Sequence, residues 1–149
     1  MKIQKLLIAT VVGAVFLLLA DMVWYTMVMT DSMDMPNARL NAEGQPYPDM
    51  MWMVISYIIV ALAFSAIYSK WSGGGSKLNS GLNYGLWMGL LVGLGMNLMW
   101  FSLVTTMTLN QTLIDSAYTI VKYVILGIVV AYAYGMGDGA RGKASGGGE

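Results

Sequence analysis

The hydrophobic positions of the chain fall into four long, nearly uninterrupted stretches. They run from Lys5 to Met29, from Met50 to Ser69, from Leu82 to Met107 and from Ser116 to Gly135. A helix that crosses a bilayer needs about 20 mostly apolar residues, and each stretch meets that length. The runs do not alternate apolar and polar positions as the strands of a membrane β-barrel do. The pattern therefore predicts an all-α fold, a four-helix transmembrane bundle in a single domain over residues 1–136.

Polar segments connect the apolar stretches. Residues 71–81 (WSGGGSKLNSG) are rich in Gly and Ser, so they predict a short turn between antiparallel second and third helices. Residues 30–49 contain all three prolines and a net negative charge, so we expect an irregular, solvated loop. Residues 108–115 are expected to form a second loop on the same side. The Gly-rich residues 137–149 predict a disordered tail.

The first stretch also has features of a secretory signal, with a basic start and an apolar middle. Cleavage after Ala20 would leave Leu18 where a small residue is preferred, and the apolar pattern continues through Met29. We therefore favour a retained helix.

Composition narrows the class of protein. Hydrophobic residues make up 57% of the chain and charged residues only 11%, which is too apolar for a water-soluble domain of this length. Eight basic residues balance eight acidic ones, so no basic surplus favours nucleic acid as a partner. Cysteine and histidine are both absent, which excludes disulfides, thiolate or imidazole metal sites and His-dependent acid–base catalysis. The sequence therefore predicts no enzyme, no catalytic residue, no cofactor and no metal site of these kinds.

The distribution of basic residues predicts the orientation of the bundle. One side of the predicted membrane holds Lys2, Lys5, Lys70, Lys77, Arg141 and Lys143, and the other side holds only Arg39. By the positive-inside rule, both termini are cytoplasmic and the protein is a multi-pass protein of the cell inner membrane. Trp24, Tyr25 and Tyr118 are expected in the outer aromatic belt, and Tyr84 in the inner one.

The third stretch contains glycines at four-residue steps. They are Gly81, Gly85, Gly89 and Gly93, and Gly127, Ala131 and Gly135 repeat the spacing more weakly in the fourth stretch. Such small residues let two helix backbones approach closely in lipid. Because four residues turn an α-helix by about 400°, the stripe drifts by about 40° per step, which favours a right-handed crossing. The contact is either within one bundle, or between copies of the chain or with a larger membrane complex.

Asp21 is an ionisable residue deep in the first stretch. It lies roughly 12 Å from the outer end near Met29, where a carboxylate costs about 2.5–3.5 kcal/mol. Lys122 lies roughly 10 Å beyond Asp115 in the fourth stretch, at a similar depth. We therefore expect an Asp21–Lys122 contact. The alternatives are that Lys122 extends outward to the headgroups, and that Asp21 is protonated with a local hydrogen bond.

Further polar residues fall at the same level of the predicted bundle. Asn97 on the third helix, and Ser56 and Tyr57 on the second, would complete an outer-half polar layer around the charged pair. Intramembrane polar residues of this kind mark either helix contacts or a ligand or ion site.

Methionines are frequent near the outer side. There are 14 in the chain, and MVMTDSMDMP places four of them between positions 27 and 35. Thioethers suit Cu(I), which makes a copper site at this Met-rich mouth a lesser possibility, whereas methionine is also a common apolar filler of helices.

Three segments carry a family resemblance. They are VWY at Val23 to Tyr25, the glycine-stepped third stretch, and LIDSAYTIVKYVILG at Leu113 to Gly127. Together they resemble a family of small bacterial four-helix membrane proteins of unknown function, over roughly residues 8 to 135. The shared motifs are the Trp-Tyr pair and the Ile-Asp-x-x-Tyr motif at Ile114, Asp115 and Tyr118. The resemblance implies fold and location but no activity, and it implies a small residue where this chain has Asp21.

Two functions are compatible with these patterns. The first is a non-enzymatic packing or accessory subunit in the lipid bilayer that self-associates as a homo-oligomer or docks onto a larger membrane complex. The second is a binder or carrier of a small ligand or ion through the outer-half polar layer.

Overall fold

The computed structural model describes residues 3–27, 49–71, 76–103 and 108–142, with side chains as far as residue 135. The helices are α1 (Ile3–Met27), α2 (Met50–Tyr68), α3 (Lys77–Gly89), the π-helical segment η1 (Leu90–Met96), α4 (Asn97–Leu103) and α5 (Leu109–Gly142). The segments α3, η1 and α4 follow one another without a break and form one span. All four spans are long and apolar enough to cross a membrane. The predicted all-α, four-helix transmembrane fold is confirmed.

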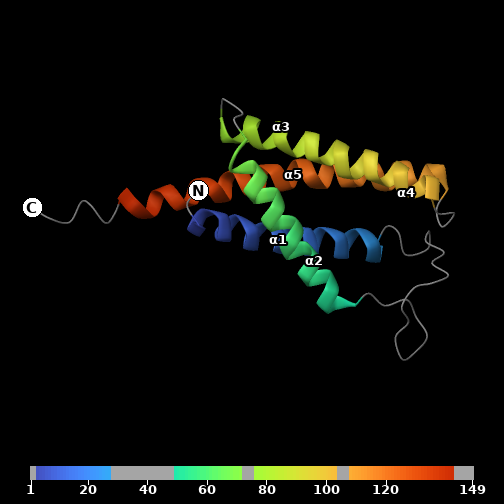
Figure 1. Cartoon of the computed structure of the whole chain (residues 1–149), viewed down its shortest axis with the longest axis horizontal. Coiled ribbons are helices and arrows are strands. Elements are labelled where there is room, and N and C mark those ends of the chain that lie inside the picture. Colours follow the sequence, from blue (N-terminus) through green and yellow to red (C-terminus); the bar gives the residue numbers. More distant parts are fainter. Residues whose placement is uncertain (1–2, 28–48, 72–75, 104–107, 143–149) are drawn as a thin grey trace, which may run out of the picture.

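The helices lie side by side in an antiparallel arrangement (Figure 1). The span α3–η1–α4 packs along α5, α1 packs against α5 as well, and α2 crosses α1 obliquely. At one end of the molecule, α1 and α3 begin and α2 and α5 end. Following the predicted orientation, we call the opposite end, where α1 ends and α5 begins, the outer end.

The start of α5 differs from the prediction. Thr108 and Gln111 form a reciprocal cap, in which the Thr108 backbone N–H donates to Gln111 Oε1 at 2.8 Å and the Gln111 N–H donates to Thr108 Oγ1 at 3.3 Å. Such a capping box fixes the first turn of a helix. The prediction of a loop over residues 108–115 was therefore wrong, because this stretch is helical from Leu109 onward.

The end of α5 also differs from the predicted boundary. The helix continues to Gly142, six residues into the segment 137–149 that was predicted to be a tail. Extending a formed helix adds one hydrogen bond for each residue fixed, which favours continuation past isolated glycines. The remaining residues, 143–149, lie outside the described part of the chain.

The packed core lies toward the inner half, where all four spans meet. Leu17, Phe64, Leu126 and Val130 are buried there, and the Tyr84 hydroxyl donates to the Phe64 carbonyl at 2.8 Å. Tyr84 is only 1% exposed, so its assignment to the inner aromatic belt was wrong. Large apolar side chains cover the outside of every span, as expected for surfaces that face lipid rather than water.

The glycine stripe of α3 packs against α5 within the same chain. A Cβ added to Gly81 would lie 2.6 Å from the Gly127 carbonyl oxygen and 3.0 Å from the Ala131 Cβ, and one added to Gly85 would meet the Tyr123 carbonyl oxygen. At the inner end, a Cβ on Gly135 would collide with the side chain of Lys77. The close backbone approach predicted for these small residues is therefore present between α3 and α5 at Gly81, Gly85 and Gly127, whereas Gly135 meets a side chain.

The stripe stays on α5 beyond α3. Gly89 lies against Ile120, Gly93 against Ile120 and Ser116, and Asn97 then hydrogen-bonds to residues 115 and 116. The predicted drift of about 40° per step would carry the stripe off α5 over this distance. The segment η1 offsets it, because each π turn holds about one residue more than an α turn and so rotates the helix back.

Candidate functional site: an intramembrane polar cluster

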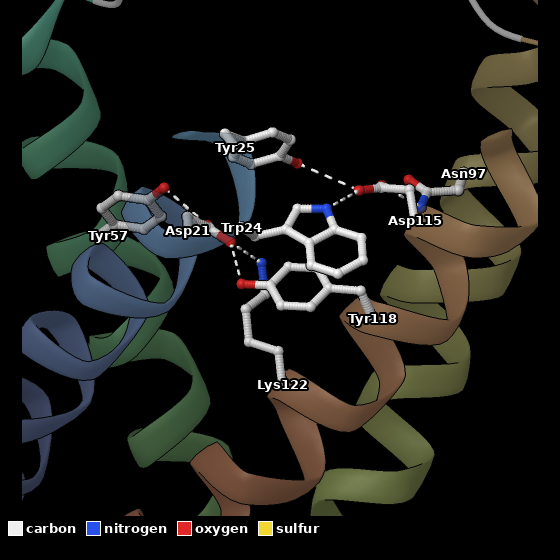
Figure 2. Close-up of polar contacts among 8 residues, drawn as sticks. All are labelled: Asp21, Trp24, Tyr25, Tyr57, Asn97, Asp115, Tyr118 and Lys122. Carbon is white, nitrogen blue, oxygen red and sulfur yellow. Dashed lines mark hydrogen bonds and ion pairs between the residues drawn. The ribbon is translucent and has the colours of Figure 1, made fainter. Parts of the chain in front are cut away.

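Asp21 and Lys122 form a buried ion pair. The Lys122 Nζ lies 2.7 Å from Asp21 Oδ1, and the two residues are 9% and 7% exposed (Figure 2). The predicted contact between the first and fourth spans is therefore present. The alternative in which Lys122 extends outward to the headgroups does not hold, because its side chain is enclosed by the bundle.

Two tyrosines complete the surroundings of Asp21. The Tyr57 hydroxyl donates to Asp21 Oδ2 at 2.7 Å, and the Tyr118 hydroxyl donates to Asp21 Oδ1 at 3.0 Å. With Lys122, three donors from α2 and α5 converge on one carboxylate of α1. Both oxygens of this buried carboxylate therefore have hydrogen-bond partners.

Asp115 is a second buried carboxylate, although it was predicted to lie in a loop. It lies in the second turn of α5 and is 8% exposed. Its Oδ1 accepts from the Trp24 indole N–H at 3.2 Å and, more weakly, from the Tyr25 hydroxyl at 3.5 Å. Its Oδ2 accepts from the Asn97 amide at 3.0 Å. All these donors are neutral.

Asn97 joins the cluster through Asp115 rather than through Asp21. Its Nδ2 lies 3.0 Å from Asp115 Oδ2 and 3.4 Å from Ser116 Oγ, which itself donates to the Thr112 carbonyl at 2.7 Å. The prediction that Asn97 belongs to an intramembrane polar layer therefore holds, with a different carboxylate as its partner.

Ser56 does not belong to the layer. Its side chain is exposed, whereas the neighbouring Tyr57 points into the bundle and reaches Asp21. Successive residues of an α-helix point about 100° apart, so only one of the two can face α1. The inclusion of Ser56 was wrong.

A stacked aromatic pair joins the two carboxylates. Trp24 and Tyr118 lie face to face, with ring centroids 4.1 Å apart and planes within 1° of parallel. Trp24 donates to Asp115, and Tyr118 donates to Asp21. The Lys122 ammonium lies 5.1 Å from the centre of the Tyr118 ring, within the range of a cation–π contact. We call these eight residues the polar cluster: Asp21, Trp24, Tyr25, Tyr57, Asn97, Asp115, Tyr118 and Lys122.

Asp115 was not predicted as a site residue, and Trp24, Tyr25 and Tyr118 were predicted to lie in an interfacial belt. A spacing signal could have found them. On α1, an acid at position 21 is followed by aromatic residues three and four positions later, and on α5 an acid at position 115 is followed by Tyr118 and then Lys122. Residues at these separations share one face of a helix, so both helices present an acid and its aromatic neighbours to the same side.

The cluster contains more acid than base. Among the described residues of the four spans away from their ends, two carboxylates and one ammonium are buried together. Within the same part of the chain, no three acidic, His or Cys side chains gather as a metal site would require. The methionines at positions 29, 33 and 35, on which the possible Cu(I) site depended, lie outside the described residues.

Comparison with known proteins identifies a family and no more. The sequence profile described as "Protein of unknown function (DUF1761)" matches residues 8–131. No curated protein and no solved structure matches the chain. Two motifs that carry the family resemblance contact each other in the structure. Trp24 and Tyr25 of the Trp-Tyr pair reach Asp115 of the Ile-Asp-x-x-Tyr motif, and Trp24 also stacks on its Tyr118.

Proposed function

The chain belongs to the DUF1761 family, and from its own geometry we propose that it is a non-enzymatic multi-pass membrane protein that binds one small monovalent cation, such as a proton, in the polar cluster. The observation that carries this proposal is the excess of one carboxylate in a buried site. Asp21 has Lys122 as its counter-charge, whereas the donors to Asp115 among the described residues are all neutral.

Energetics support a charge-compensating ligand. An uncompensated carboxylate inside a membrane protein costs several kcal/mol, and intramembrane acids usually pair with a cation or hold a proton. A bound proton or alkali cation at Asp115 would make the cluster neutral. The hydrogen-bond partners of Asp115 can accommodate either a bound proton or a bound alkali cation. The Tyr25 hydroxyl and the Asn97 amide can each turn an oxygen toward the ligand as well as donate a hydrogen.

The packing favours a very small ligand. Each carboxylate is already surrounded by three side-chain donors, and the Trp24–Tyr118 stack occupies the space between them. A proton needs no additional volume, and an alkali cation needs only a rearrangement of oxygen atoms. This proposal develops the ion-binding alternative, since a second buried acid now joins the pair found from the sequence.

Infrared difference spectroscopy on the protein in lipid nanodiscs tests the proposal. On a downward pH step, we expect the carbonyl band of a protonated carboxylic acid, lost in Asp115→Asn and retained in Ser56→Ala, which alters an exposed residue outside the cluster. At constant pH, thermal unfolding is then followed with added Li⁺, Na⁺ or K⁺. A cation that binds only the folded protein stabilises it by RT ln(1 + c/Kd) at a free cation concentration c, so the melting temperature should rise with that concentration. If neither the infrared spectrum nor the melting temperature responds, the proposal fails.

A role as an accessory subunit is the second candidate, favoured by the outer half of α2. Trp52, Ile55 and Ile59 are exposed there, and α4 contains no buried residue, so both elements present wide surfaces to other helices or lipid. Since the glycine stripe of α3 is occupied by α5, a homo-oligomer or larger complex would have to use these other surfaces. Native mass spectrometry in mild detergent would detect a discrete oligomer or a co-purifying subunit.

The orientation and membrane are part of the same proposal. Lys5, Lys70 and Lys77 all lie near the inner end of their spans, which supports cytoplasmic termini and insertion in the inner membrane. Because the chain has no cysteine, single cysteines at residues 4 and 109 can be labelled from either side of the membrane. We expect a membrane-impermeant reagent to reach only residue 109 from outside.

A further inference from the structure

We propose that η1 is a register switch, which the Asn97–Asp115 hydrogen bond holds in its π-helical form and which ligand binding at Asp115 releases. The second, α-helical register is inferred from the helix geometry and the backbone packing. The link to ligand binding rests on the proposed function. Ligand binding at Asp115 in the polar cluster would then determine which face of α4 is turned toward α5.

The π-helical segment is unusual in length and position. It spans seven residues, Leu90–Met96, in the middle of a transmembrane span. π-Helical turns are rare, occur mostly as single turns, and are frequent at functional sites. A segment of this length persists only where contacts on both of its sides hold it.

The contacts on the two sides of η1 are unequal. On the α3 side, Gly81, Gly85 and Gly89 lie directly on the α5 backbone, so this part of the span cannot rotate. On the α4 side no residue is buried, and Asn97 supplies the side-chain hydrogen bonds from α4 to α5. The direction in which α4 faces therefore depends on Asn97 and its partner Asp115.

Return of η1 to an α-helix would change what faces Asp115. Removing the additional residue of the π turn rotates everything that follows by about 100°, so Asn97 leaves the seam and Met96 takes its place. The apolar Met96 cannot donate to a carboxylate, and an ionised Asp115 therefore favours the π register. A proton or cation on Asp115 removes much of that requirement.

The part of η1 that follows Gly93 offers little resistance to the change. Gly93 itself lies against Ile120 and Ser116 of α5, whereas a Cβ placed on Gly95 would approach only the Leu90 carbonyl oxygen, at 3.7 Å. No packed side chain at this position opposes rewinding. The switch thus consists of α3, which is fixed on α5, the Asn97–Asp115 hydrogen bond, and the segment η1 between them, which can rewind.

Disulfide cross-linking in the full chain tests the proposal, since the protein has no cysteine of its own. From the Asn97–Asp115 contact, we expect residue 101, one turn beyond Asn97, to face Thr112 of α5 in the π register, and residue 100 to take that place in the α register. The two reporters are Phe101→Cys and Trp100→Cys, each combined with Thr112→Cys. In the otherwise unchanged chain we expect the 101–112 pair to form preferentially.

Asn97→Leu should shift the ratio of the two yields toward 100–112 by about tenfold, the effect of losing one hydrogen bond. Asp115→Asn should shift it in the same direction. Asn97→Gln, which keeps an amide donor, should retain the original preference, and so should Ser102→Ala, whose hydroxyl bonds only to the Met99 carbonyl of its own helix.

Two results would overturn the switch. One is preferential 100–112 formation in the otherwise unchanged chain, and the other is an unaltered ratio in both Asn97→Leu and Asp115→Asn. If Asn97→Leu does not accumulate, Asp115→Asn decides alone. A shifted ratio without any infrared or thermal response to cations would refute the proposed function and leave the register switch intact.

Discussion

The rings of Trp24 and Tyr118 stack at 4.1 Å and connect two carboxylates that lie on different helices. Each ring also carries a donor, so the indole binds Asp115 while the phenol binds Asp21. The stack therefore couples the acids of α1 and α5 through packing as well as through hydrogen bonds.

Breaking the ion pair from one side should be costly. Lys122→Met leaves the Asp21 carboxylate buried without its cation, so we expect a loss of about 3–5 kcal/mol in the free energy of unfolding. Asp21→Leu combined with Lys122→Met removes both charges and should recover most of that loss. Reversible unfolding in mixed micelles measures both. A double variant no more stable than Lys122→Met alone would contradict the pairing.

The indole hydrogen bond can be separated from the indole's packing. Trp24→Phe keeps a stacking ring but removes the N–H that binds Asp115, and a hydrogen bond to a charged group contributes about 1.5–3 kcal/mol. Trp52→Phe, at an exposed position on α2, is the matched control and should change little. Equal effects of the two substitutions on thermal unfolding would argue against a specific role for Trp24.

Neighbouring residues on α2 should behave differently. Tyr57→Phe removes the hydroxyl that donates to Asp21 at 2.7 Å, with an expected loss of about 1.5–3 kcal/mol. Ser56→Ala alters an exposed hydroxyl and should change the unfolding free energy by less than about 0.5 kcal/mol. Both variants are unfolded in the same micelles. A larger loss of unfolding free energy in Ser56→Ala than in Tyr57→Phe would contradict the structure.

Two glycines of the third span offer a test of the seam. A Cβ on Gly85 would collide with the Tyr123 carbonyl oxygen, so Gly85→Ala should force α3 and α5 apart and destabilise by about 1–3 kcal/mol. Gly95→Ala places its Cβ 3.7 Å from the Leu90 carbonyl oxygen, an ordinary van der Waals contact, and should be tolerated. Thermal stability in detergent distinguishes them, and tolerance of Gly85→Ala would exclude close helix contact at this position.

The apolar runs predicted the four spans, but not where the third and fourth begin. The third span starts at Lys77 and the fourth at Leu109, five and seven residues before the predicted boundaries. Hydropathy does not detect polar residues inside a helix, such as those of the Thr108–Gln111 cap. Asp115 was consequently read as part of a loop rather than as a buried acid.

The ion pair was predicted from matching depths, although the start of the fourth helix was misplaced. Lys122 lies 13 residues from the start of α5 rather than seven, so it is roughly 9 Å farther from that start than predicted. Its long side chain makes up the difference by reaching toward Asp21 beside the Tyr118 hydroxyl. The π-helical offset that brings Asn97 to Asp115 leaves no comparable signal in the sequence, because it depends on how two backbones fit together.

The buried pair of Asp21 and Lys122 also constrains how the gene can change. A mutation that replaces either residue alone leaves the opposite charge buried without a partner, so the single variants should fold poorly. The two charged residues should consequently appear and disappear together during evolution, or one shortly after the other. In an alignment of relatives, this pair should then stand out as covarying positions, with uncharged residues at both sites wherever one is missing.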